Sequence, residues 1–411
     1  MADIRNRFNV RVLTCTCPHD WEAEMVRVGP EWEGVVRMVP KAEHFVIKIH
    51  DLRTPAVLIL KEEMLSKGGD CAIHRDAITH KVERSDVLMM GTGKAFTQAI
   101  ESLRLQPFGL ARLADEIETA MRNIKRTSPI TPADADLPAR LRPFYSALRE
   151  RTAIMGILNV TPDSFSDGGL YATREAAIEH GLRMIQDGAD VLDIGGESSR
   201  PGAEPVPLQE ELSRVVPVIE ALASRSETPI SIDTYKPDVA RAALDAGASI
   251  INDISGLADE HMRALAAERK APTVIMHMKG TPQTMQAEAE YADLISEIMA
   301  YFRERIALAV EAGLPEEYII LDPGIGFAKN AGHNMEIIRK LADFKAIGLP
   351  ILIGTSRKAF IGQALGGLPA PERLFGTAAT VALSIQNGAN IIRVHDVKEM
   401  AQVARMADAM S

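Results

Sequence analysis

The sequence predicts an α/β fold, a (β/α)8 TIM barrel preceded by a small α/β domain. From residue 152 onward, short apolar runs alternate with amphipathic stretches, as strands alternate with helices. Several of these stretches end in a glycine just before the next apolar run, where helices commonly end. The runs fill about 260 residues, the usual size of a closed barrel. They lie at 152–160, 191–196, 229–233, 249–254, 272–277, 318–322, 350–354 and 391–394.

An open, doubly wound sheet is the alternative to a barrel. Such sheets often carry a glycine-rich dinucleotide fingerprint after their first strand. No such fingerprint follows the predicted strands here, and this favours closure of the sheet.

The whole-chain totals limit the function classes. The chain has 411 residues, enough for a barrel with an extension, and its net charge is -10. This charge argues against nucleic acid and anionic membranes as general partners, because both favour a basic surface. No run approaches the ~20 apolar residues of a membrane helix. The N-terminus, charged from Asp3 onward, lacks a signal-peptide core, so we expect a cytoplasmic protein.

Cysteine usage also suits a cytoplasmic protein. The chain has three cysteines, Cys15, Cys17 and Cys71, which give no disulfide framework and suit a reducing compartment. The segment CTCPH at Cys15–His19 resembles half of a metal site. Because no second Cys/His pair follows at zinc spacing, we expect no metal there.

Residues 1–125 are predicted to form the small α/β domain, whose role the sequence does not indicate. Strand-like and helix-like segments alternate from His44 to Ile124. The segment GTGK at Gly91–Lys94 follows a predicted strand and opens a helix, as a phosphate loop does. It lacks the complete phosphate-loop pattern, and Ala95 stands where the hydroxyl is needed, so we interpret it as a tight turn.

Residues 126–150 hold four prolines among polar residues and are predicted to be a proline-rich linker. The barrel then covers residues 151–411. Its first strand ends in Asn159 and runs into a loop rich in Gly, Pro, Ser and Asp. This loop carries Asp163 and one aromatic residue, Phe165, which is typical of a mobile loop that closes over a ligand.

The predicted strands deliver polar side chains to one end of the barrel. In barrels of this type the active site lies at the C-terminal ends of the strands. Eight strands that all end in polar side chains are difficult to explain by structural roles alone. We assign Asp193, Glu197 and Asp253 to support, and the other candidates at the strand ends are Asn159, Asp233, Asn252, Met276, Asp322, Ser356, Lys358, Arg393 and His395.

The residue types indicate the chemistry. Carboxylates beside an amide suit a flat heterocycle with an amino-amidine edge, whose N–H groups pair with carboxylate oxygens. Lys358 can donate to a ring carbonyl or nitrogen, and Met276 and Phe327 can pack on the ring faces. The donor and acceptor set comprises Asp233, Asn252, Asp322 and Lys358.

A second group is predicted to hold an anion. Asn159, Arg393 and His395 end the first and last strands, which are neighbours in a closed barrel. The asparagine oxygen can also bind a hard metal such as Mg²⁺. The barrel has no cysteine and no Ser–His–Asp signature, so a covalent enzyme intermediate is not indicated. A displacement with an anionic leaving group fits better.

Seven motifs in order resemble the dihydropteroate synthase family across residues 152–411. They are GILNVTPDSFSDGG, GGESSRPGA, SIDTYKPDVA, INDISG, LDPGIGFAK, GTSRKAFIG and RVHDV. The resemblance implies a transferase of folate biosynthesis that joins p-aminobenzoate to 6-hydroxymethyl-7,8-dihydropterin diphosphate in an SN1-like reaction. It also implies Mg²⁺, a homodimer and inhibition by sulfonamides.

The resemblance implies roles for individual residues. Asp233, Asn252, Asp322 and Lys358 would hold the pterin, Asn159 would ligate Mg²⁺, and Arg393 and His395 would contact the diphosphate. Asp163 and Phe165 would close over the cation. The p-aminobenzoate pocket would include Phe165, Ser199, Arg200, Pro201, Phe327 and Ser356. The family commonly has threonine at Ser199, so we expect altered packing there with the reaction retained.

Two other functions are weighed against this one. A pterin-dependent methyltransferase shares the barrel and the pterin carboxylates, but it has no need for the NVTPDSF loop or the SRK and RVHD groups. A non-enzymatic pterin-binding or scaffold protein is the third interpretation. The intact set of strand-end residues argues against it.

Overall fold

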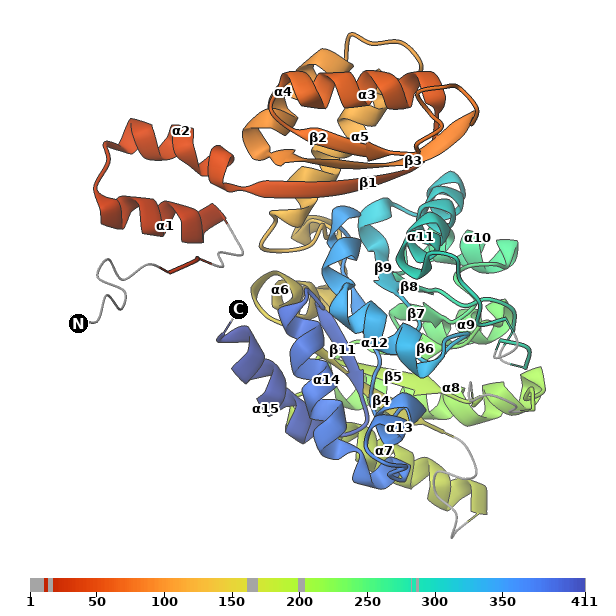
Figure 1. Cartoon of the computed structure of the whole chain (residues 1–411). Helices are drawn as coiled ribbons and strands as arrows, with labels where there is room; N and C mark the ends of the chain where they lie inside the picture. The colour runs from red at the N-terminus through yellow and green to blue at the C-terminus, as the bar shows by residue number, and fades with distance from the viewer. Residues whose placement is uncertain are drawn as a thin grey trace. The chain divides into compact units, whose positions relative to one another are not determined.

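The computed structural model describes residues 11–13, 18–160, 169–198, 204–281, 283–285 and 288–410. The chain divides into two compact units, Met1–Lys125 and Arg126–Ser411. Figure 1 shows the elements of each unit. No helix in the described part of the chain is long and apolar enough to span a membrane.

The first unit is a three-stranded antiparallel sheet packed with helices, as predicted. Alternate residues of the central strand, such as Val87 and Met89, are buried, because successive side chains of a strand point to opposite faces. The strand order is β1-β3-β2. The elements are α1 (Pro18–Val28), α2 (Trp32–Ala42), β1 (His44–Arg53), α3 (Thr54–Ser66), β2 (Asp70–Ile73), β3 (Arg84–Thr92), α4 (Gly93–Leu103) and α5 (Leu110–Ile124).

The GTGK segment is a tight strand-to-helix turn. β3 ends at Thr92, whose side chain accepts a hydrogen bond from the Ala95 backbone N–H at 3.2 Å and so caps α4. A Cβ atom added at Gly93 would lie 3.1 Å from a Glu43 carboxylate oxygen and 3.2 Å from the Pro40 carbonyl oxygen. The helix start is therefore packed against α2 and β1, and it does not form an open cradle for phosphate.

The second unit is the predicted barrel, with eight parallel strands in the order β10-β11-β4-β5-β6-β7-β8-β9. A parallel bridge between Leu321 and Ile351 brings the two outer strands together, so the sheet is nearly closed and is not doubly wound. The strands are β4 (Ala153–Asn159), β5 (Val191–Gly195), β6 (Ile230–Asp233), β7 (Ile250–Asp253), β8 (Thr273–Met276), β9 (Ile319–Asp322), β10 (Leu352–Ile353) and β11 (Ile391–Val394).

Helices surround the barrel and alternate with its strands (Figure 1). Each strand is buried on both faces, as expected of a parallel sheet covered by helices. The helices are α7 (Gly169–Asp187), α8 (Leu208–Arg225), α9 (Pro237–Asp245), α10 (Glu260–Arg269), α11 (Leu294–Glu311), α12 (Ala331–Arg339), α13 (Ala359–Ala364), α14 (Leu374–Gln386) and α15 (Val397–Asp408).

Residues 126–150, expected to form a linker, are part of the second unit. They contain α6 (Arg142–Glu150), and side chains including Leu141, Phe144 and Tyr145 are buried in the barrel core. Arg140 donates to the Ala223 carbonyl at 2.8 Å, near the C-terminal end of α8, and to the Gly247 carbonyl at 3.2 Å, between α9 and β7. The segment therefore covers the N-terminal ends of the strands. The proline density that suggested a linker instead accompanies short helical turns.

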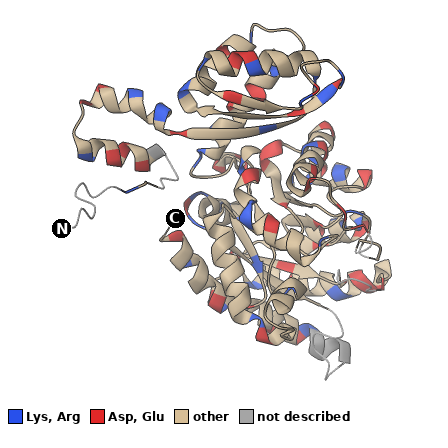
Figure 2. Ribbon diagram, in the orientation of Figure 1, with Lys and Arg blue, Asp and Glu red and all other residues tan. Residues whose placement is uncertain are grey.

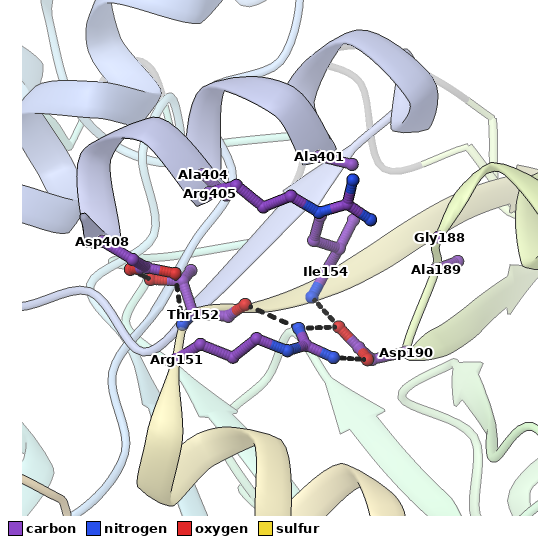
Figure 3. A pocket seen from close by; sticks show the side chains of 10 residues that line it. All are labelled: Arg151, Thr152, Ile154, Gly188, Ala189, Asp190, Ala401, Ala404, Arg405 and Asp408. Atoms are coloured by element: carbon purple, nitrogen blue, oxygen red, sulfur yellow. Dashed lines mark hydrogen bonds and ion pairs between the residues drawn. The ribbon is translucent and has the colours of Figure 1, made fainter.

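Two carboxylates anchor the start of β4 at the same end of the barrel. Asp190 accepts from both terminal nitrogens of Arg151, at 2.9 and 2.6 Å, and from the Ile154 N–H at 2.9 Å. Asp408 accepts from the Thr152 hydroxyl at 2.7 Å and from its N–H at 3.0 Å. Figure 3 shows these bonds around a hollow of about 200 Å³. Because its carboxylates are already bonded, we interpret the hollow as structural.

The packing of residues 126–150 makes a testable prediction for stability. Phe144 is 1% exposed in the barrel core, so Phe144→Ala should lower the free energy of unfolding by about 3–5 kcal/mol. Urea unfolding followed by far-UV circular dichroism measures this loss. Val310→Ala, at a position that is 45% exposed, is the control and should cost about 0.5 kcal/mol or less. A loss for Phe144→Ala no larger than the control would contradict the core role.

Candidate active site

A polar pocket opens at the C-terminal ends of the barrel strands. Seven residues predicted from the sequence line it: Asp233, Asn252, Met276, Asp322, Phe327, Lys358 and Arg393. They come from six strand ends, β6 to β11, or from the turns that follow them. Parallel strands bring these residues together because all of their C-terminal ends meet at one rim.

The Arg393 guanidinium is the centre of the pocket's polar network. Its Nε donates to Asp193 Oδ2 at 2.6 Å, and a terminal nitrogen donates to Asp233 Oδ2 at 2.5 Å. Asn252 Nδ2 also donates to Asp193 Oδ2, at 3.0 Å. Arg393 is on β11, and β4 lies between β11 and β5 in the sheet, so the side chain reaches across the barrel interior to Asp193.

Charge balance explains the protonation of this network. Burial disfavours the Arg393 cation, but Asp193 and Asp233 outweigh that effect and raise the pKa of Arg393. Burial raises the pKa of Asp233 to about 7, although Arg393 opposes this shift. The guanidinium is therefore always charged, whereas Asp233 gains a proton as the pH falls through neutrality.

Asp322 and Lys358 also line the pocket, from the end of β9 and from the turn after β10. Asp322 Oδ1 accepts from the Gly324 N–H at 2.7 Å, and burial raises the pKa of this carboxyl. Lys358 Nζ donates to the Ile325 carbonyl at 2.8 Å, and burial lowers the pKa of Lys358 to about 8. Both groups therefore keep hydrogen-bonding capacity for a ligand.

An apolar wall completes the pocket. Met276 and Phe327 belong to one buried cluster with Ile254, Met285 and Ala328. Lys358 Nζ lies 4.3 Å from the centroid of the Phe327 ring, within cation–π distance. A flat ligand between this wall and the carboxylates would have apolar contacts on its face and polar contacts on its edge.

Two residues beside the pocket have left-handed backbone conformations. Ala328, which follows Phe327, has a φ of 50°, and Arg357, which precedes Lys358, has a φ of 58°. Such conformations are unfavourable for residues with a Cβ atom and often occur at functional sites. Arg357 is held by Asp396 through its Nε at 3.0 Å.

Ser356 and His395 lie together outside the pocket lining. The Ser356 hydroxyl is 3.0 Å from His395 Nδ1 and accepts from the His395 N–H at 3.2 Å. Burial, with Arg357 and Arg393, lowers the pKa of His395 to about 3. His395 is therefore neutral near pH 7 and can contribute a hydrogen bond, but no charge, to an anion site. Arg393 does carry a positive charge, and the carboxylates of Asp193 and Asp233 balance it.

Of the remaining predicted residues, the structure describes Asn159 but not those assigned to the two loops. Asn159 ends β4 and is half-buried. Among the described residues, no group of three His, Cys, Asp or Glu side chains could hold a metal. The residues assigned to the two loops lie outside the described residues: Asp163, Phe165, Ser199, Arg200 and Pro201.

The residues assigned to support have identifiable bonds. Glu197 accepts from Lys236 Nζ at 2.5 Å and from the Tyr235 hydroxyl at 2.9 Å. Asp253 accepts from the Ser255 and Leu257 N–H groups, at 2.8 and 3.0 Å. Asp193 has the larger role, because it joins Arg393 to Asn252.

The sequence interpretation missed three residues that line the pocket, Ile254, Ile325 and Gly354. Ile254 and Gly354 are the last residues of the predicted strands 249–254 and 350–354, and Ile325 lies three residues after the strand 318–322, so their position was the available signal. It also missed the buried Lys329, which bonds to two backbone carbonyls near the pocket. No charge pattern around this lysine distinguishes it from an exposed one in the sequence.

The fold and the pocket together define a class of protein. A (β/α)8 barrel with paired carboxylates, an amide and a lysine facing an apolar wall is typical of a barrel enzyme for a small, flat, polar ligand.

Comparisons with known proteins give the family. The sequence profile described as "Pterin binding enzyme" matches residues 155–395. The dihydropteroate synthase of Synechocystis sp. is 51% identical over 262 residues, which are 64% of this chain and 91% of that protein. The dihydropteroate synthase of Xanthomonas albilineans has been solved with 4-aminobenzoic acid. That structure is 43% identical, has a TM-score of 0.61, and covers 64% of this chain and 93% of its own.

A third relative extends into the first unit. The probable bifunctional folylpolyglutamate synthase/dihydropteroate synthase of Halobacterium salinarum is 42% identical over 376 residues. This match covers 92% of this chain and 44% of that protein. The chain belongs to the dihydropteroate synthase family of pterin binding enzymes.

The Arg393 network makes a prediction for stability. Asp193→Ala leaves the Arg393 Nε and Asn252 Nδ2 donors without their shared acceptor, and each unpaired buried donor costs about 1–3 kcal/mol. The variant should therefore lose about 3 kcal/mol of unfolding free energy, measured in urea. Glu304→Ala on the exposed side of α11 is the control. A loss for Asp193→Ala equal to the control would show that the network contributes nothing.

Proposed function

We propose that the chain is a dihydropteroate synthase. It joins p-aminobenzoate to 6-hydroxymethyl-7,8-dihydropterin diphosphate and produces 7,8-dihydropteroate and diphosphate for folate biosynthesis. The observation that carries this proposal is the pocket, which presents carboxylates, an amide and a lysine opposite an apolar wall in a barrel of this family.

The pterin is assigned to the polar pocket. Ionised carboxylates accept hydrogen bonds from the amino group and ring N–H groups of a pterin, and charged acceptors make these bonds strong. Lys358 donates to the ring carbonyl or a ring nitrogen, and the faces of the ring pack on Met276 and Phe327. The residues assigned to the ring edge are Asp233, Asn252, Asp322 and Lys358.

The diphosphate is assigned to the rim formed by β4 and β11, near Asn159, Arg393 and His395. The neutral His395 can donate one ring N–H, and Arg393 can donate from its guanidinium group, although Asp193 and Asp233 balance its positive charge. Mg²⁺ fits this assignment, because it commonly takes only one or two protein ligands and otherwise binds water and substrate phosphates. Asn159 would be its protein ligand, and the ion would neutralise charge on the diphosphate.

The reaction is assigned an SN1-like course. The bond between the pterin methylene carbon and the diphosphate oxygen breaks, and its electron pair leaves with the diphosphate. The p-aminobenzoate nitrogen then forms the new C–N bond and releases a proton. Carboxylates fixed around the ring stabilise the positive charge of the intermediate. Asp163 and Phe165 are assigned to the loop that covers this cationic intermediate. The residues assigned to the p-aminobenzoate pocket are Ser199, Arg200, Pro201, Phe327 and Ser356.

The alternative is a pterin-dependent methyltransferase of the same barrel class. That reaction requires neither an anion site nor a loop that covers a reactive cation. The NVTPDSF, SRK and RVHD motifs favour the synthase.

A homodimer is the proposed assembly, with the exposed face of α14 as the contact. This helix has no charged residue (Figure 2). Its Phe375 side chain is 85% exposed. Burial of such a face against a second copy would remove apolar surface from water. A molar mass of one chain in light scattering would contradict the dimer.

The central experiment is a diphosphate-release assay with the purified full chain. We expect release from 6-hydroxymethyl-7,8-dihydropterin diphosphate that depends on p-aminobenzoate, with 7,8-dihydropteroate identified by mass spectrometry. Folded protein without such release would contradict the proposal.

The same assay on Arg126–Ser411 tests the first unit. The fragment begins at Arg126 because residues 126–150 belong to the barrel core. Full activity of the fragment would limit Met1–Lys125 to stability, assembly or binding of a partner. Reduced activity of a folded fragment would show that the first unit supports catalysis.

A further inference from the structure

Gly354 lines the polar pocket, and no step above uses it. It directly follows β10, so it lies at the same rim as the residues at the other strand ends. Ile353 pairs with Ile392 in the parallel register of β10 and β11, so Gly354 stands next to Arg393. Paired residues of neighbouring strands point to the same face of a sheet, and the Arg393 side chain points into the barrel. A side chain at position 354 would therefore also point into the pocket.

The fold does not require a glycine at this position. Among the described residues, an added Cβ atom would have one neighbour within 4 Å, the Arg393 Cβ atom at 3.8 Å, which is an ordinary van der Waals contact. The φ angle of Gly354 lies outside the left-handed region, so a residue with a side chain can adopt the same backbone conformation. Glycine also loses more conformational freedom on folding than any other residue. The barrel itself therefore gains nothing from glycine here.

Two other glycines near the pocket differ from Gly354 in this respect. Gly324 has a φ of 70°, and its added Cβ atom would lie 2.1 Å from the His277 carbonyl oxygen. Gly326 has a φ of 82°, which is also in the left-handed region. Backbone conformation and packing therefore explain these two glycines, but they do not explain Gly354. Its missing side chain leaves space only to the pocket.

Gly354 lies across the barrel mouth from Asp233. The strand order is β10-β11-β4-β5-β6-β7-β8-β9, and the bridge between Leu321 and Ile351 joins the two ends of this order. β10 and β6 are therefore four strands apart in either direction, and their ends are on opposite sides of the rim. Asp233 is the last residue of β6. A flat ligand that pairs with Asp233 through one edge therefore extends towards Gly354 with its far end.

The space at Gly354 lengthens the pocket along this line. A pterin has two fused rings, and its amino-amidine edge belongs to one of them. When that edge pairs with the acceptors around Asp233, the second ring lies towards Gly354. A single-ring 2-aminopyrimidin-4-one has the same donors and acceptors on its edge, but it does not reach as far. The space at Gly354 therefore distinguishes the two ligands by size and not by hydrogen bonds.

We propose that Gly354 is a specificity-determining residue, whose missing side chain makes room for the second ring of the pterin. This role rests on the proposed function, because it assumes that the edge of the pterin pairs with the acceptors around Asp233. A methyl group in this space would overpack the pocket when the ligand is bound, but not when the pocket is empty. Gly354→Ala should therefore weaken binding of a two-ring ligand and leave the folded protein intact.

The test compares two ligands on the full chain, 6-hydroxymethyl-7,8-dihydropterin by calorimetry and 2-aminopyrimidin-4-one by ligand-detected NMR, which suits weaker binding. In Gly354→Ala the pterin affinity should fall by about 5-fold to 150-fold, the range expected of an overpacked site. The affinity for the single-ring ligand should change by less than about 3-fold. The urea midpoint of unfolding should stay the same or rise, because alanine loses less conformational freedom than glycine.

Gly34→Ala is the matched control. Gly34 is in α2, where an added Cβ atom would lie 3.8 Å from Met38 Cε, again an ordinary contact. This variant adds the same methyl group away from the barrel mouth. It should fold stably and bind both ligands as the wild type does.

Three results would overturn the proposal. Unchanged pterin affinity in Gly354→Ala would show that the ligand does not occupy this space. An equal loss of affinity for both ligands would show that the methyl group disturbs the acceptors and not the second ring. Loss of folding in Gly354→Ala would show that the barrel itself needs the glycine. Failure of the wild type to bind the pterin would instead contradict the proposed function.

Discussion

The pocket depends on one buried interaction, the pairing of Arg393 with Asp193 and Asp233. A guanidinium inside a barrel requires charged partners, since an unpaired buried charge is strongly unfavourable. Its two partners stand on neighbouring strands, and Asn252 joins through Asp193, so β5, β6, β7 and β11 are fixed relative to one another. The acceptors for a ligand are therefore in place before it arrives, which is how a preorganised site lowers the cost of binding.

The two ends of the barrel have different tasks. At the N-terminal end, Asp190 and Asp408 hold β4, and residues 126–150 cover the strands with buried side chains. At the C-terminal end, buried charges replace apolar packing, and residues such as Ala328 and Arg357 adopt left-handed conformations. Stability supplied by one end permits the polar and strained arrangement at the other.

The sequence was sufficient for the barrel because each strand and helix has its own local pattern. It also predicts that Asp233, Asn252, Asp322 and Lys358 lie together, because the ends of parallel strands meet at one rim, and these four residues line one pocket in the structure. Their roles toward a ligand stay a prediction. It could not show that Arg393 is bonded to Asp193 and Asp233, or that His395 is neutral, because both depend on burial and on partners distant in the chain. The same limit applies to Lys329, whose burial has no local signal, and to residues 126–150, where proline density predicts a linker but side chains such as Phe144 and Tyr145 are buried in the barrel core.

The most direct test of this account is titration of Asp233→Ala and Lys358→Ala with 6-hydroxymethyl-7,8-dihydropterin diphosphate. Each change removes a buried partner of the pterin, which costs about 1–3 kcal/mol. Affinity should therefore fall by about 5-fold to 150-fold in each variant. Lys340→Ala, at an exposed residue directly after α12, should bind as the wild type does. Unchanged affinity in both pocket variants, with folding intact, would show that the pterin does not bind in this pocket.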